Sequence, residues 1–189
     1  MWYVIQVIAG QEHAIADLLE RVIPQAMLEE CFFPQYETEM KVRGTWVPCK
    51  KPMFPGYIIA VTDQPDALAR ELRRIPQFAR VLSMGDVFVP LAAEEVALIG
   101  GFSSKGNRVV PMSHAIKDGD RVVVTSGPLV GCEGLIKQLN RSKSVAFLET
   151  EICGQKVAVR VGLSVVSATD TSEARALADA RRTLAGARG

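Results

Sequence analysis

A turn-forming segment directly before an apolar strand most constrains how this chain can fold. Residues 50–61 begin with two lysines, continue with two prolines and a glycine, and end in an apolar run. Neither proline can donate a backbone hydrogen bond, so this part forms a turn or the edge of a sheet. Gly56 supplies the freedom to turn, and the run 57–61 predicts a buried strand. We therefore expect Phe54 and Tyr57 at the beginning of a strand, either as core residues or as part of a binding surface.

The rest of the first hundred residues shows strand and helix patterns in turn. Residues 11–23 carry an apolar stripe at helical spacing, with Glu12 on a polar face, and the helix ends at a proline. Asp63 is predicted to cap a second helix that stops before Pro76. This order is typical of an α+β domain in which helices flank an antiparallel sheet. The other predicted elements are strands at 2–8 and 78–82, a hairpin at 36–47 with its tip at Arg43-Gly44-Thr45, and a helix at 91–99.

The second part of the chain has a different texture. Residues 1–100 are predicted as one domain, and residues 101–116 as a linker because they begin rich in glycine and serine. Residues 117–167 contain five short strand patterns separated by turn signals, with the last two at 155–161 and 163–166. That pattern predicts a small all-β barrel. Residues 168–189 are rich in alanine and arginine and are predicted as a partly helical tail.

Charge is distributed unevenly along the chain. The net charge is +1, but the first hundred residues hold nine Lys and Arg against thirteen Asp and Glu. The remaining residues hold thirteen basic against eight acidic side chains. The second part is therefore the better candidate for binding an anionic partner.

The sequence carries no recognisable reaction centre. Its four cysteines form no C-x-x-C pair, no phosphate-binding glycine loop is present, and zinc spacing is absent. We expect reduced core cysteines, no metal, no cofactor and no enzymatic activity. The alternative, in which Cys31 or Cys49 is a nucleophile and His13 or His114 its base, has no supporting motif. The chain starts with a strand pattern and contains no membrane-spanning apolar run, so we expect a cytoplasmic protein.

Two motifs resemble elements of one protein family. Residues 53–57 resemble the Phe-Pro-Gly-Tyr element of the NusG family of transcription elongation factors. Residues 127–134 resemble the glycine-centred signature of KOW domains, which are SH3-like barrels; its turn residues are Gly127, Pro128, Gly131 and Gly134. The resemblance covers residues 1 to about 167. It implies an NGN-like first domain, a KOW barrel, and binding to the clamp helices of RNA polymerase through a pocket formed by Trp2, Phe54, Pro55 and Tyr57.

Within the family, the residues of both motifs are similar to those of the LoaP group. These paralogues are processive antiterminators of long biosynthetic operons, and their KOW barrel is held to contact a structured leader RNA. Leu129 and Cys132 stand where general NusG factors usually carry aromatic residues that bind a ribosomal protein or Rho. We therefore expect a monomeric antiterminator that recognises a leader RNA. The alternative is a general NusG factor that modulates pausing and termination and couples to the ribosome or Rho.

Basic side chains provide the candidates for nucleic-acid contact. In the first domain, residues expected to face upstream or non-template DNA are Lys41, Arg43, Arg70, Arg73 and Arg74. In the barrel, residues expected to contact RNA are Arg121, Lys137, Arg141, Lys143, Lys156 and Arg160. The simpler interpretation is that these side chains are solvated, and that lysines on the hairpin discourage pairing between sheets. A plain RNA-binding protein would leave the first domain unexplained.

Overall fold

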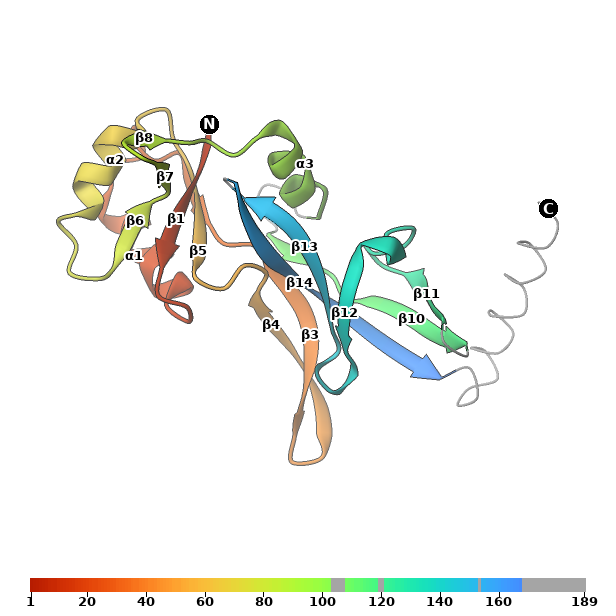
Figure 1. Cartoon of the computed structure of the whole chain (residues 1–189). Helices are drawn as coiled ribbons and strands as arrows, with labels where there is room; N and C mark the ends of the chain where they lie inside the picture. The colour runs from red at the N-terminus through yellow and green to blue at the C-terminus, as the bar shows by residue number, and fades with distance from the viewer. Residues whose placement is uncertain (103–107, 119–120, 153, 168–189) are drawn as a thin grey trace. The chain divides into compact units, whose positions relative to one another are not determined.

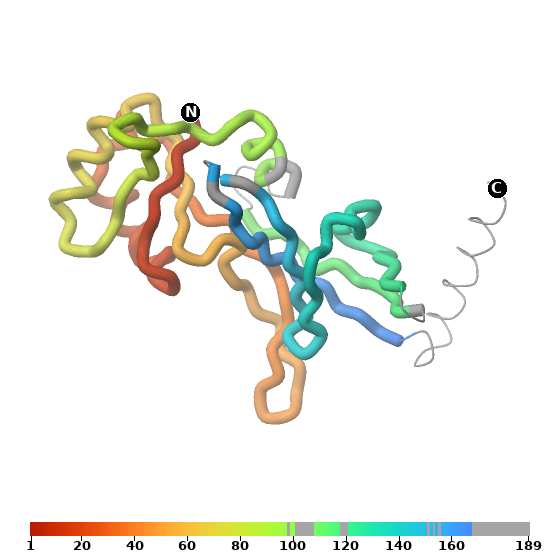
Figure 2. Tube along the Cα trace, in the orientation of Figure 1, coloured from red at the N-terminus to blue at the C-terminus, as the bar shows by residue number. Residues whose placement is uncertain are grey.

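The computed structural model describes residues 1–102, 108–118, 121–152 and 154–167 (Figures 1 and 2). The chain forms two compact units, each built from separate stretches of sequence. Among the described residues, the first unit contains those within Met1–Tyr36, Lys50–Val110 and Glu149–Arg160, and the second contains those within Glu37–Cys49, Pro111–Leu148 and 161–167. The boundaries predicted from the sequence put residues 37–49 in the first domain and residues 149–160 in the second. In the structure, residues 37–49 belong to the second unit and residues 149–160 to the first.

An antiparallel sheet flanked by two helices forms the first unit, as the sequence predicts (Figure 1). The strand order is β2-β5-β1-β6, and each registered pair is antiparallel. The strands are β1 (Trp2–Val7), β2 (Glu30–Phe32), β5 (Tyr57–Val61) and β6 (Ala79–Val81), and the helices are α1 (Glu12–Val22) and α2 (Pro65–Leu72). Alternate residues of β1 and β5 join apolar residues of both helices in one core, which includes Tyr3, Ile5, Ile58, Ile15, Leu19, Leu68 and Leu72.

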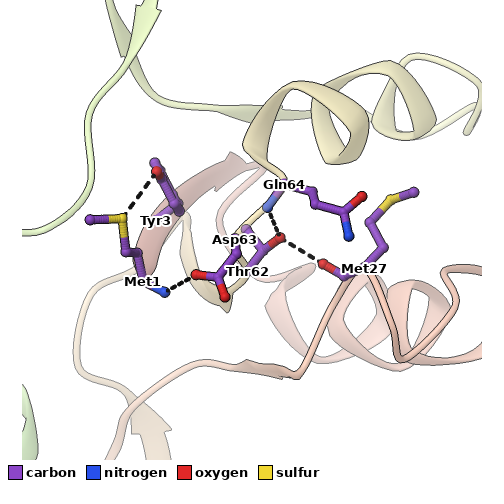
Figure 3. A network of polar contacts seen from close by, with 6 residues as sticks. All are labelled: Met1, Tyr3, Met27, Thr62, Asp63 and Gln64. Carbon is purple, nitrogen blue, oxygen red and sulfur yellow. Dashed lines mark hydrogen bonds and ion pairs between the residues drawn. The ribbon is translucent and has the colours of Figure 1, made fainter.

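The predicted cap of α2 is wrong. Gln64 occupies the N-cap position, and the helix starts at Pro65, where a missing backbone N–H does no harm. Asp63 Oδ1 instead accepts a hydrogen bond from the N-terminal ammonium of Met1 at 3.0 Å (Figure 3). The buried Thr62 side chain organises this corner, because its hydroxyl donates to Met27 O at 2.6 Å and accepts from Gln64 N at 2.9 Å.

Short elements complete the first unit between residue 83 and residue 110. They are β7 (Ser83–Met84), β8 (Val87–Phe88), α3 (Ala93–Phe102) and β9 (Val109–Val110). β7 and β8 form a two-stranded antiparallel pair. β9 pairs in parallel with the beginning of β3. The range predicted as a linker therefore contains a regular element, β9.

The predicted hairpin is confirmed. β3 (Gln35–Val42) and β4 (Thr45–Pro52) are neighbours in a sheet of order β4-β3-β9. Arg43 and Gly44 form the tip with φ of 48° and 88°. Two consecutive residues with positive φ are what a tight two-residue hairpin turn requires.

A five-stranded sheet of order β11-β10-β14-β13-β12 carries the remaining strands. They are β10 (Ser113–Asp118), β11 (Arg121–Ser126), β12 (Ile136–Asn140), β13 (Val145–Ile152) and β14 (Gln155–Ser167), with short 3-10 turns at Glu133–Leu135 and Arg141–Lys143. Closure of this sheet into an SH3-like barrel stays a prediction. The predicted tail lies outside the described residues.

Two sequence predictions about these strands need correction. Residues 113–116 were predicted as linker but belong to β10, and the two strands predicted at 155–161 and 163–166 are one continuous strand, β14. Both differences have one physical reason: β10 pairs in parallel with the end of β14, Ser113 opposite Leu163. A pairing between segments so distant in sequence leaves no local pattern to read.

Candidate functional site

A buried carboxylate fixes the turn at Gly56. Glu12 is 2% exposed. Its Oε1 accepts a hydrogen bond from Gly56 N at 2.7 Å, and its Oε2 accepts one from Gly10 N at 2.8 Å. Gly56 has φ of 86°, and a Cβ there would lie 3.3 Å from Val7 O. Both the backbone conformation and the close approach therefore require glycine.

The four predicted pocket residues come from the beginning of β1 and from the turn that leads into β5. Trp2 is half-buried and pairs with Val61, whereas Tyr57 is half-buried and pairs with Gln6. Paired residues and their second neighbours share a sheet face, so Trp2 and Tyr57 lie on one face, about 14 Å apart along the strands. This face is opposite the one that packs on α1 and α2.

The remaining two pocket residues differ in exposure. Phe54 is 3% exposed and therefore belongs to the interior, whereas Pro55 is half-buried at the turn. The backbone beside Phe54 is also engaged, because Met53 N donates to Pro34 O at 2.8 Å and Met53 O accepts from Arg160 N at 3.1 Å. The interpretation of Phe54 as a core residue thus describes this structure, and the accessible part of the turn is Pro55 and Tyr57.

Trp2 instead belongs to a cluster that the sequence did not indicate. Arg108 lies over the Phe32 ring at 3.9 Å and over the Trp2 ring at 5.4 Å, and the two rings meet edge to face at 5.2 Å. Its guanidinium also donates to both carboxylate oxygens of Glu30, at 2.7 and 2.9 Å. Arg108 falls in the range predicted as a linker. Its contacts with Glu30, Phe32 and Trp2 form only in the folded chain.

The arginines of the second helix are less alike than predicted. α2 ends at Leu72, so Arg73 is the C-cap and Arg74 lies beyond the helix. Arg74 Nη1 donates to both carboxylate oxygens of Glu71, at 2.8 and 3.0 Å. Arg70, Arg73 and Arg74 are all exposed, as are Lys41 and Arg43 on the hairpin.

The hairpin exposes apolar as well as basic side chains. Met40, Val42, Trp46 and Val47 are between 41% and 44% exposed. The hairpin residues 37–49 belong to the second unit, whereas α2 belongs to the first. The two sets of predicted DNA-facing residues are therefore properties of separate units.

The six predicted RNA-contacting side chains are all exposed. Four of them, Arg121, Lys137, Arg141 and Lys143, belong to the second unit, while Lys156 and Arg160 belong to the first. Lys156 Nζ lies 3.4 Å from Glu149 Oε1. The predicted RNA set is thus divided, and the second unit holds its larger part.

The predicted KOW turn is tightly packed against β10. Gly127 has φ of 93°, and a Cβ there would lie 2.6 Å from Ser113 Cα. Leu129 is fully buried, and its N–H donates to Ser113 Oγ at 3.2 Å. Leu129 therefore anchors the turn and offers no exposed area to a partner.

Of the three described cysteines, only Cys31 is the core residue that the sequence predicts. Cys31 is buried, and this burial together with the charges of Glu20 and Glu30 raises the pKa of its thiol to about 12. A thiol with so high a pKa is protonated at neutral pH and is a poor nucleophile. Cys49 and Cys132 are partly exposed free thiols, and Cys153 lies outside the described residues.

Clusters of metal-ligating side chains and membrane-spanning helices are absent from the described part of the chain. In the described part of the chain, no group of three or more His, Cys, Asp or Glu side chains could hold a metal ion. No helix there has the length and apolarity needed to cross a membrane. The first unit offers an anchored turn and half-buried aromatic side chains, and the second offers exposed cations on a sheet. The described fold therefore combines a mixed α+β part with a β-rich part.

Comparison with known proteins gives the family. The model of the family described as transcription termination factor nusG matches residues 1–100. The chain belongs to the NusG family.

Curated relatives align over most of both chains, and each is described as a transcription termination/antitermination protein NusG. The Deinococcus radiodurans protein is 28% identical over 187 residues, covering 88% of this chain and 97% of its own. The Thermus thermophilus protein is 27% identical, covering 87% and 96%. A solved structure described as "Domain interaction in Thermotoga maritima NusG" aligns with a TM-score of 0.49 and 18% identity, covering 85% of this chain and 92% of that one. The relatives are transcription factors, which supports the prediction that the chain is not an enzyme.

Proposed function

We propose that this protein binds the clamp helices of RNA polymerase and promotes processive elongation through terminators. The observation that carries the proposal is the turn at Gly56, anchored by Glu12 in the segment that resembles the family's Phe-Pro-Gly-Tyr element. This anchor holds Pro55 and Tyr57, which are both half-buried, at the beginning of β5. A rigid, partly apolar surface can bind a partner helix with little loss of conformational entropy.

The proposal assigns no chemistry to the protein. Binding that is tighter to elongating polymerase than to paused or terminating polymerase shifts the equilibrium toward elongation. The size of the effect equals the difference in affinity between the two states, so even a tenfold difference is about 1.4 kcal/mol. The exposed Arg70 of α2, the exposed Arg73 and Arg74 that follow it, and the basic residues of the hairpin would contact nearby DNA.

We further propose that the second unit recognises a leader RNA, so that the protein serves a specific operon as LoaP-type paralogues do. Two features support this part. Four exposed cations of the second unit suit a phosphate backbone, and the burial of Leu129 removes the position at which general NusG factors usually present an aromatic side chain. The names of the curated relatives favour the second candidate, a general termination/antitermination factor.

In vitro transcription through an intrinsic terminator tests the proposal. The cognate polymerase is used with and without the native leader RNA, and wild type is compared with Tyr57→Ala. Phe54→Ala is unsuitable, because truncating a buried Phe typically costs about 3–5 kcal/mol of stability. Phe78→Ala is the matched control, since Phe78 is 48% exposed and is not part of the proposed binding surface at Pro55 and Tyr57.

We expect readthrough to rise with wild type, to require the leader, and to fall at least several-fold for Tyr57→Ala but not for Phe78→Ala. Readthrough that is independent of the leader would favour the general factor. Wild-type protein that does not bind polymerase would overturn the proposal.

A further inference from the structure

The second unit contains a cavity to which the function proposed above assigns no ligand. Its volume is about 300 Å³, at the lower end of the ~300–1,000 Å³ typical of small-molecule sites. Its walls come from four elements: Val122 of β11, Glu133 of the 3-10 turn, Leu163 of β14, and residues 136–139 of β12. A cavity of this size accommodates one planar ring system.

An irregularity in β12 shapes this cavity. Successive side chains of a regular strand point to opposite faces. In this strand, however, Ile136 pairs with Leu148 while Gln138 pairs with Phe147, so Lys137 is an extra residue. Such a β-bulge redirects side chains and is often found beside functional sites. The bulge lies at the cavity, whose lining includes Ile136, Lys137, Gln138 and Leu139.

The lining combines apolar walls with a small polar set. Val122, Ile136 and Leu139 are half-buried and can contact the faces of a planar ring, while Leu163 is fully buried behind them. An ionised carboxylate accepts hydrogen bonds and donates none. Glu133 is held in place, since its Oε1 accepts a hydrogen bond from Val124 N at 3.2 Å. The Gln138 amide can both donate and accept, and the Lys137 ammonium can bind an anion.

We propose that this cavity binds one unpaired guanine of an RNA strand, with Lys137 at the adjoining phosphate. Guanine presents two adjacent N–H donors on its Watson–Crick edge, and the Glu133 carboxylate can accept both. Adenine, cytosine and uracil each place an acceptor beside a donor on that edge, which would face the carboxylate unfavourably. Proteins commonly read RNA through such extruded single bases.

The charges around the cavity fit a nucleic acid. Arg121 directly precedes Val122, and Arg141 and Lys143 follow the end of β12; all three side chains are exposed. Contacts of this kind to phosphates position a strand, while contacts to base edges give specificity. The inference rests on the proposed function, because it names the chemistry by which the second unit would recognise its leader RNA.

Fluorescence anisotropy of the full chain with short single-stranded RNAs tests the proposal. The RNAs are equal in length and differ only in one central base. Glu133→Gln keeps an oxygen that can accept from Val124 N but adds donors, and Glu149→Gln is the matched control on an exposed carboxylate. Leu139→Phe fills the cavity, and Val130→Phe adds the same ring at a position 46% exposed and outside the lining.

We expect wild type to bind the guanine RNA about tenfold more tightly than the adenine RNA, as a good bidentate contact to a base provides. Glu133→Gln and Leu139→Phe should abolish this preference, while both controls keep it. Thermal unfolding of each variant shows whether it is folded; if Leu139→Phe is not, Glu133→Gln alone decides. Wild-type binding without base preference, or a preference that survives Glu133→Gln, would overturn the proposal.

The outcome is separable from that of the proposed function. If the native leader still supports readthrough while the guanine preference is absent, the cavity proposal fails and the antitermination proposal stands. If polymerase is not bound, the antitermination proposal fails whatever the RNA preference.

Discussion

At the scale of single residues, Glu12 links two backbone turns through one carboxylate. A buried charge is tolerated only when its hydrogen-bonding capacity is used, and here Gly10 N and Gly56 N both donate to it. The side chain thereby couples the beginning of α1 to the turn before β5. Its role is to position Pro55 and Tyr57. Glu12 therefore supports the proposed binding site by holding the turn, not by contacting a partner.

Replacing Glu12 should destabilise the protein. Glu12→Gln keeps one acceptor but places an amide donor against a backbone donor, so we expect a loss of about 1–3 kcal/mol, the usual penalty for an unsatisfied buried group. Glu20→Gln, an exposed change on the same helix, should leave the free energy of unfolding nearly unchanged. Urea unfolding measures both. Equal stability of the two variants would contradict the assigned role.

Cys31 should make the protein less stable in alkali. Burial and two nearby carboxylates raise its pKa from the ordinary 9.0 to about 12. Above pH 9 the unfolded chain loses this proton while the folded chain keeps it, so the unfolding free energy falls as pH rises, by up to about 1.4 kcal/mol per pH unit. The difference in unfolding free energy between wild type and Cys31→Ala, measured by urea unfolding from pH 8 to 10.5, should shrink accordingly. A constant difference would contradict it.

At the scale of elements, Arg108 holds β9 on the first unit. β9 has two residues and gains little from backbone pairing, although Gln35 N donates to Arg108 O at 2.8 Å. The side-chain contacts of Arg108 with Glu30 and with the Phe32 and Trp2 rings add to this. Guanidinium groups suit such sites because their planar fork binds a carboxylate in two places and stacks on a ring.

A double-mutant cycle measures this contact. Arg108→Ala leaves Glu30 as an unpaired, partly buried charge, and we expect it to lower stability by about 2–4 kcal/mol. Adding Glu30→Gln should recover part of the loss, with a coupling energy of about 1–2 kcal/mol. In a Trp46→Phe background, Trp2 fluorescence should shift to the red as its ring becomes more exposed. Strictly additive effects and an unchanged spectrum would contradict the cluster.

At the scale of the whole molecule, charge is divided between the two parts of the chain. The acidic excess lies in the first hundred residues and the basic excess beyond them. Four exposed cations of the second unit, Arg121, Lys137, Arg141 and Lys143, are the candidates for phosphate contact. Exposed charges act within about 10 Å at 0.1 M salt, so their effect on an RNA should be local.

The salt dependence of RNA binding should reveal how many of these contacts form. Each phosphate contact to a single strand contributes about −0.7 to the slope of log affinity against log salt concentration. Four contacts predict a slope near −3 by the same relation, and alanine at Arg141 or Lys143 should reduce its magnitude by about 0.7. Anisotropy titrations between 50 and 200 mM salt, a range over which such slopes are measurable, provide the test. A slope that these substitutions leave unchanged would contradict their role.

Several elements could be predicted from short stretches of sequence. Prolines and a glycine delimit β5, which matches the predicted strand at 57–61. The apolar stripe of residues 11–23 predicts α1 to within about one residue at each end. The hairpin tip predicted at Arg43-Gly44-Thr45 is also confirmed, because Arg43 and Gly44 have positive φ in the structure. Steric and periodic effects of this kind act over a few neighbouring residues, so they can be read locally.

The sequence by itself therefore determined several local elements, among them α1, β5 and the hairpin of β3 and β4, and, through two motifs, the resemblance to the family. Only the tertiary structure decided which side chains those elements bring together. Glu12 meets Gly56 across 44 residues, and Arg108 meets Glu30 across 78. Phe54 and Leu129 are apolar in either role, and only the packing around them shows that both are interior. Burial and pairing depend on partners distant in sequence, and no periodicity or motif encodes such partners locally.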